Sequence, residues 1–179
     1  MIYTVEEALQ KGESEEVWNR WSSEMKPIPL LLAVPGFLTA QRFKGLGVDP
    51  APSLAIYSLE SGDVLTSEPY LRGARGGNLG TPSWKAKLSF WHRNLFSGID
   101  RAPPVALDAR LLVQESATPD VVVDSVKFIW LTAAGLDRTT PCRGLAVVEK
   151  AAAQRYLDAP RAGLTVYAPL AAQAVSAPR

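Results

Sequence analysis

The chain has 179 residues, of which 47% are hydrophobic and 21% charged, a composition typical of a folded globular protein and unlike that of a disordered chain. Nineteen Lys and Arg against eighteen Asp and Glu leave a formal net charge of +1, so no strong electrostatic field would attract nucleic acid or an anionic membrane. The longest apolar run, residues 28–37, contains two prolines and is too short to span a bilayer, and the first residues lack the pattern of a signal peptide; together these features predict a cytoplasmic protein.

The first predicted elements are a strand at residues 1–5 and a helix that begins after Ser14. Ser14 supplies a side-chain acceptor for the helix N-terminus, and Glu15 and Glu16 place negative charge in the first turn. Apolar side chains then recur at three- and four-residue spacing, which predicts one buried helical face. The members of this face are Val17, Trp18, Trp21 and Met25. Pro27 is expected to end or bend the helix.

Alternating or apolar segments at residues 38–44, 53–59 and 90–99 predict three further strands. A short helical stretch across residues 64–71, ended by the Gly76-Gly77 pair, precedes the last of them. The order strand, helix, strand, strand, helix, strand is that of a ferredoxin-like βαββαβ unit.

A weakened copy of this pattern follows at residues 105–170, so we expect a ferredoxin-like half over residues 1–101, a degenerate second half, and a tail at 171–179. In the second half we expect strands at 107–114, 143–149 and 164–170, and a helix at 124–134. Three matched pairs keep nearly constant separations, namely Trp21 and Trp130, Pro35 and Pro141, and Tyr57 and Tyr167. The alternative is that two stretches of any α+β chain recur in rough register by chance.

Six short segments of the first hundred residues stand in a moderately specific order and spacing. They are Asn19-Arg20-Trp21, Leu31 to Phe37, Arg42-Phe43, Leu54 to Tyr57, Val64 to Ser67, and Arg93 to Phe96. Together they resemble the EthD-like branch of the dimeric α/β-barrel superfamily. The resemblance implies an α+β fold in which ferredoxin-like sheets pack into a barrel, usually by forming a homodimer, with a pocket between each sheet and its helices.

The superfamily includes cofactor-independent isomerases, cyclases and lyases that act on small cyclic or aromatic compounds, and also haem enzymes and oxygenases. Fold alone does not choose among these activities. Many relatives carry an acidic residue and a histidine just before the Pro-Leu-Leu segment, whereas this chain has Glu24-Met25-Lys26-Pro27 there. The role of that histidine therefore cannot be transferred.

His92 is the only histidine and the first candidate catalytic residue. Strand alternation places it on one face with Phe90, Asn94 and Phe96, and a side chain with a pKa near about 6.5 can both accept and donate a proton at neutral pH. The alternative is a structural histidine bonded to backbone or solvent. Tyr57 is the second catalytic candidate, with a place in the core as its alternative.

Six further residues are candidates for substrate binding, because aromatic rings stack on flat ligands and guanidinium or amide groups hold carbonyl and carboxylate oxygens. They are Trp21, Asn19, Arg42, Tyr70, Trp91 and Asn94. Most of the aromatic side chains have a place in the core as the simpler explanation.

No metal or cofactor is expected, because one histidine and one cysteine cannot form the usual metal clusters. Cys142 is interpreted as a small apolar core residue. Residues 76–80 are Gly-rich but lack the Lys-Ser/Thr ending of a phosphate loop.

These observations favour a cofactor-independent lyase, dehydratase or isomerase that acts by proton transfer on a small aromatic or unsaturated carbonyl compound. A non-catalytic binding protein for a hydrophobic metabolite is the alternative from another class, and haem binding through His92 is a third hypothesis. The expected partner is a small molecule, with neither nucleic acid nor a membrane.

Overall fold

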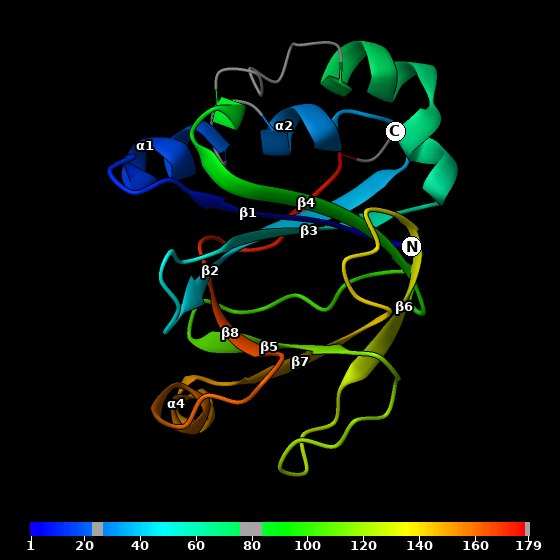
Figure 1. Cartoon of the computed structure of the whole chain (residues 1–179). Helices are drawn as coiled ribbons and strands as arrows, with labels where there is room; N and C mark the ends of the chain where they lie inside the picture. The colour runs from blue at the N-terminus through cyan, green and yellow to red at the C-terminus, as the bar shows by residue number, and fades with distance from the viewer. Residues whose placement is uncertain (23–26, 76–83, 178–179) are drawn as a thin grey trace.

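Eight antiparallel strands form one closed barrel in the computed structural model, which describes residues 1–22, 27–75 and 84–177 (Figure 1). The strands are β1 (Ile2–Leu9), β2 (Phe37–Leu46), β3 (Ser53–Leu59), β4 (Leu88–Ser97), β5 (Ala109–Ser116), β6 (Ile129–Leu136), β7 (Cys142–Glu149) and β8 (Leu164–Pro169). Their order is β3-β1-β4-β6-β7-β5-β8-β2, and pairing of β2 with β3 closes the ring. A two-residue strand, β9 (Ala174–Val175), pairs with β2 beyond the end of β8.

Helices are few and short. The described helices and helical turns are α1 (Glu15–Arg20), α2 (Pro27–Leu32), η2 (Gly62–Thr66), η3 (Tyr70–Arg75) and α4 (Lys150–Asp158). The first four lie against the half of the barrel built by β1 to β4, and α4 lies against the half built by β5 to β8 (Figure 1). No helix in the described ranges is long and apolar enough to cross a membrane.

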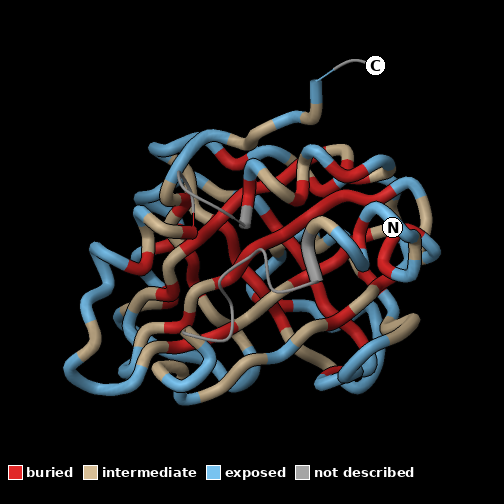
Figure 2. Tube along the Cα trace, turned by 90° about the horizontal axis from the view of Figure 1, so that it is seen from above, coloured by how far each residue is buried: buried red, intermediate tan, exposed pale blue. Residues whose placement is uncertain are grey.

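Side-chain alternation along the strands produces three apolar layers. The barrel interior contains Ile2, Phe43, Leu54, Phe96, Leu111, Leu131 and Leu145 among others. A second layer lies between the first-half sheet and α2, with Tyr3, Leu31, Phe37, Tyr57 and Tyr70. A third lies under α4. Buried positions accordingly run along the strands, while exposed positions concentrate in the loops (Figure 2).

The ferredoxin-like α+β prediction is wrong for this chain, because the strands form a single, mostly β, antiparallel barrel. The eight ring strands all come from one chain, so the barrel closes through β4 with β6 and β2 with β8, with no strand from a second subunit. The order of pairing within β2-β3-β1-β4 is the same as within β6-β7-β5-β8. Duplication of one half stays a prediction.

The predicted helix at 124–134 is also wrong, since β6 occupies most of that segment. Asp124 and Ser125 have positive φ values of 47° and 64°, which a right-handed helix does not allow. From Ile129 onwards the backbone pairs with both β4 and β7, so long-range hydrogen bonds replace the local helical ones. The other predicted strands are confirmed close to their predicted bounds.

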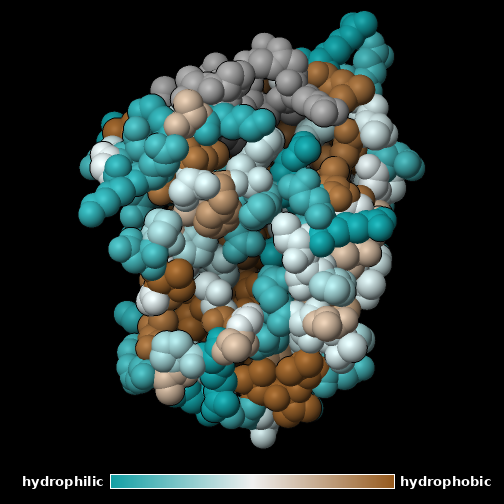
Figure 3. All heavy atoms as spheres, in the orientation of Figure 1, coloured by the Kyte–Doolittle hydropathy of each residue, from teal (hydrophilic) through white to brown (hydrophobic). Residues whose placement is uncertain are grey.

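The exterior of the second half carries several exposed apolar side chains, including Leu107, Val122 and Val147. In the space-filling view, hydrophobic patches lie in the lower part of the molecule, where β5, β7, β8 and α4 lie, and also in its upper part (Figures 1 and 3).

Candidate ligand cavity beside helix α1

Helix α1 begins with a side-chain cap, and an ion pair joins it to β2. The backbone N–H of Val17 donates to Ser14 Oγ at 3.3 Å, as the sequence predicts for the N-terminus. Glu15 Oε2 lies 2.8 Å from Lys44 Nζ of β2. The apolar face of α1 directs Trp18 inward, where its side chain is buried.

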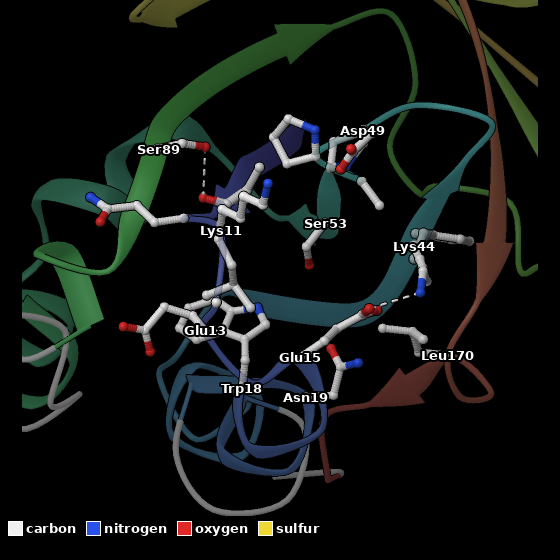
Figure 4. A pocket seen from close by; sticks show the side chains of 18 residues that line it. Lys11, Glu13, Glu15, Trp18, Asn19, Lys44, Asp49, Ser53, Ser89 and Leu170 are labelled. Atoms are coloured by element: carbon white, nitrogen blue, oxygen red, sulfur yellow. Dashed lines mark hydrogen bonds and ion pairs between the residues drawn. The ribbon is translucent and has the colours of Figure 1, made fainter.

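A cavity of about 480 Å³ lies between α1, the end of β1, β2 and the loop that leads into β3 (Figure 4). Its apolar wall includes Ala8, Leu9, Phe43, Pro52 and Leu170. Its polar wall includes Lys11, Glu13, Glu15, Asn19, Lys44, Asp49 and Ser53. This volume and this mixture of apolar and polar groups are typical of small-molecule sites.

Trp18 contributes an unusual donor to this cavity. The residue is 4% exposed, and its buried Nε1 has no hydrogen-bond partner among the described residues. In Figure 4 the indole ring of Trp18 forms part of the cavity wall. Because a buried donor without a partner costs free energy, an acceptor atom of a ligand at this point would remove that cost.

Two further tryptophan rings pack against that of Trp18. The centroid of Trp18 lies 4.9 Å from that of Trp21 and 4.8 Å from that of Trp84, and Trp21 and Trp84 are 5.5 Å apart. This packing holds the Trp18 ring in place, while Trp21 and Trp84 themselves do not belong to the cavity wall.

A buried polar cluster lies next to Trp18 on the outer face of the sheet. Arg42 Nη2 donates to Ser53 Oγ at 2.7 Å, and the guanidinium carbon lies 5.8 Å from the centroid of Trp18. Glu7 pairs with Ser53 in the register of β1 and β3. Ser53 thus connects this cluster to the cavity that it lines.

Burial changes the protonation of this cluster. It raises the pKa of Glu7 to about 7, although the positive charge of Arg42 acts in the opposite direction. Burial also lowers the pKa of Arg42, against the effect of Glu7. A carboxyl group that exchanges a proton near neutral pH therefore lies beside the cavity.

Three of the predicted site residues gather here. Asn19 lines the cavity, its backbone carbonyl accepts from Arg42 Nη1 at 3.5 Å, and Trp21 belongs to the tryptophan cluster. Tyr57 and Tyr70 lie instead in the layer beneath α2, where Tyr57 stacks on Tyr3 at 5.5 Å. Burial raises the pKa of Tyr57 well above its usual range.

The remaining candidates lie on β4, away from this cavity. Asn94 is buried in the barrel and donates to Thr139 Oγ1 at 2.9 Å. Trp91 contacts the cationic groups of Lys85 and Arg93. His92 is exposed and lines a second cavity at one end of the barrel.

Two residues of the site escaped prediction as functional groups. Trp18 was expected as part of a buried helical face and is not among the candidate site residues, and Glu7 was not singled out. A signal for Glu7 exists in the sequence: Tyr3, Val5 and Glu7 alternate along one face of β1, so a carboxyl at the third position is placed on a largely apolar surface.

Comparison with known proteins identifies a structure of similar fold but does not assign the chain to a family. Neither a family model nor a curated protein matches the chain. A solved structure described as a crystal structure study of an anthrone oxidase-like protein is similar over 99% of this chain and 94% of its own, with a TM-score of 0.56 and 12% sequence identity. This similarity concerns the fold alone. The resemblance to the EthD-like branch stays untested, and the neighbour's description gives no support to the expected lyase and isomerase classes.

Proposed function

We propose that the cavity beside α1 binds a small, flat aromatic ketone and that Glu7 takes part in proton transfer with it. The observation that carries the proposal is the buried Nε1–H of Trp18, which has no partner among the described residues and belongs to a ring in the cavity wall. A ketone oxygen is an acceptor without charge, which matches a buried neutral donor. The fold neighbour's description contains the word anthrone, a tricyclic aromatic ketone, which agrees with this ligand class.

The charges around the cavity also favour an uncharged ligand. Lys44 is paired with Glu15 at 2.8 Å, and Glu13 with Lys87 at 2.7 Å. These pairs leave no concentration of one charge on the wall, so neither an anion nor a cation gains a strong attraction.

Proton transfer follows from the position of Glu7. A donor at the ketone oxygen stabilises the negative charge that develops when a C–H next to the carbonyl system loses its proton. The proton would pass to the Glu7 carboxylate on the Ser53 side of the cavity, and the electron pair of the C–H bond would move onto the ketone oxygen opposite Trp18. A pKa of about 7 for Glu7 suits a group that accepts and returns a proton at neutral pH.

Binding is tested by titration with anthrone and with 9,10-dihydroanthracene, which has the same ring system without the carbonyl. Trp18→Phe keeps an aromatic ring but removes the donor, so we expect about tenfold weaker anthrone binding and unchanged binding of the hydrocarbon. Trp91→Phe, on β4 away from this cavity, is the matched control and should bind both as the wild type does. Equal loss of both ligands in Trp18→Phe would contradict the proposed role of the N–H.

Proton transfer is tested by exchange of the anthrone methylene hydrogens for deuterium in D₂O, followed by NMR. We expect the wild type to accelerate exchange above the buffer rate and Glu7→Gln to lose most of this acceleration while still binding anthrone. Binding without any acceleration in the wild type would favour a non-catalytic binding protein. One observation favours a non-catalytic binding protein: Glu7 does not belong to the cavity wall, so its carboxyl has no direct contact with the cavity.

A further inference from the structure

Arg42 is a buried cation on the outer face of the first-half sheet. Along β2, Phe43 belongs to the barrel interior, so alternation places Arg42 on the opposite face, where it contacts α1. The residue is 3% exposed. Because a buried charge is costly without compensation, the groups around Arg42 are expected to accept its hydrogen bonds and to respond to its charge.

Three contacts fix the position of the guanidinium. Nη2 donates to Ser53 Oγ at 2.7 Å, and Nη1 donates to the backbone carbonyl of Asn19 in α1 at 3.5 Å. The guanidinium carbon lies 5.8 Å from the centroid of the Trp18 ring. Trp18, Asn19 and Ser53 all belong to the cavity wall, whereas Arg42 does not. The arginine therefore supports the wall from outside the cavity.

Arg42 also acts on Glu7. Ser53, which accepts a hydrogen bond from Arg42, is the register partner of Glu7 in the pairing of β1 with β3. Both charged residues are buried, so salt and water screen their attraction weakly. Burial is the largest influence on the pKa of Glu7 and raises it, while the positive charge of Arg42 lowers it.

Other titratable and charged groups lie on the elements around this pair. They are Tyr57 of β3, Glu15 of α1, Lys44 of β2, and Lys85 and Arg93 at the ring of Trp91, which pairs with Glu7. Burial raises the pKa of Tyr57, so its hydroxyl is neutral at neutral pH. Glu15 and Lys44 neutralise each other at 2.8 Å. Of the described residues, Arg42 is the one whose charge shifts the pKa of Glu7.

We propose that Arg42 is the positioning residue of this cavity and stabilises the carboxylate form of Glu7 from a place fixed by Ser53, Asn19 and the Trp18 ring. The inference rests on the proton transfer proposed above, in which this carboxylate is the base. Without the cation, burial would keep Glu7 mostly protonated at neutral pH. This role is indirect and differs from the substrate binding expected of Arg42 from the sequence.

The ¹³C resonance of Glu7 Cδ, assigned by its loss in Glu7→Gln, reports the titration of this carboxyl without any ligand. We expect a midpoint of about pH 7 in the wild type. Arg42→Met and Arg42→Gln remove the charge, so the midpoint should rise by about one pH unit or more in each. Arg42→Lys retains the charge and should titrate close to the wild type. Arg110→Met removes a cation of β5 and is the matched control, expected to leave the midpoint unchanged.

Exchange of the anthrone methylene hydrogens is the second measurement. A rise of one unit leaves about fivefold less Glu7 carboxylate at pH 7, so both neutral variants should accelerate exchange about fivefold less than the wild type. The difference should narrow as the pH rises, which a loss of structure would not produce.

An unchanged Glu7 midpoint in either neutral variant, or equal shifts in Arg42→Met and Arg42→Lys, would overturn the inference. Failure of the wild type to accelerate exchange would instead contradict the proton transfer proposed above. The two failures are distinguishable, because the titration of Glu7 needs no ligand and measures the action of Arg42 in either case.

Discussion

Buried polar groups in folded proteins usually have hydrogen-bond partners and an ordinary pKa. Two side chains at the site beside α1 do not follow this rule. The Nε1–H of Trp18 is buried without an acceptor, and Glu7 is buried with a pKa of about 7. Both departures cost stability: Trp18 lines the cavity, and Glu7 pairs with Ser53, which also lines it. Buried polar groups with unfavourable surroundings are expected at sites where a bound ligand supplies the missing interactions.

The pKa of Glu7 predicts how stability depends on pH. Because this pKa is above the ordinary value of 4.5, the folded state binds more protons than the unfolded state between pH 4.5 and about 7. The free energy of unfolding therefore falls as the pH rises through this window, by up to about 3 kcal/mol. The stabilisation is present below pH 4.5 and lost above about pH 7.

Glu7→Gln cannot titrate and should lack this contribution. Urea unfolding of both proteins across the window is expected to show the difference in unfolding free energy, wild type minus variant, decreasing as the pH rises. A difference that stays constant with pH would mean that Glu7 has an ordinary pKa.

Single residues of the site were only partly predictable from sequence. Asn19, Trp21 and Arg42 were selected for their chemistry and do gather beside α1. Tyr57 was equally compatible with a pocket or the core, and only the packing of α2 places it in the core. Nothing in the pattern near Trp18 reveals that its N–H lacks a partner, because that depends on distant segments.

At the level of elements, α1 depends on local signals that the sequence displays. Ser14→Ala removes the side-chain acceptor for the N–H of Val17 and should cost about 1 kcal/mol of unfolding free energy, measured by urea denaturation. Ser14→Asp retains an acceptor and should restore stability. Equal loss in both variants would show that the cap contributes through something other than this hydrogen bond.

The strand β2 and the loop before β3 approach each other closely at Gly45. A Cβ atom there would lie 2.5 Å from Pro52 Cγ, and Pro52 belongs to the cavity wall. Gly45→Ala should therefore cost about 1–3 kcal/mol of unfolding free energy. Gly135→Ala in β6 is the matched control, because its nearest contact would be an ordinary 3.7 Å and little loss is expected.

The failed helix prediction at 124–134 shows which elements escape local reasoning. Val126, Ile129 and Trp130 have helical spacing, yet Ile129 and Trp130 enter a strand that pairs on both sides. Strand β3, by contrast, was predicted at its observed bounds, since alternation and a Pro-rich loop mark it locally. Elements whose state is decided by distant partners are the ones that sequence patterns miss.

At the scale of the whole molecule, two pairings turn an open sheet into a barrel. These are β4 with β6 and β2 with β8, which join the first half of the chain to the second. Closure leaves the eight ring strands without a free edge.

If the barrel is one cooperative unit, amides at the two closing pairs should exchange with deuterium as slowly as those between β1 and β3. Native-state hydrogen exchange measures this through residues such as Phe96 and Leu46 at the closing pairs and Ile56 in β3. Much faster exchange at the closing pairs alone would indicate that the two halves separate before they unfold.

The proposed hydrogen bond from the Trp18 indole N–H to a ligand oxygen is central to the function proposed for the cavity. It is tested most directly by the ¹H–¹⁵N resonance of Trp18 Nε1, assigned by its loss in Trp18→Phe, during addition of anthrone and of 9,10-dihydroanthracene. We predict a saturable downfield shift of the Nε1 proton with anthrone, and none of that kind with the hydrocarbon. An Nε1 resonance that is unmoved by anthrone, or that moves equally with both compounds, would contradict the claim.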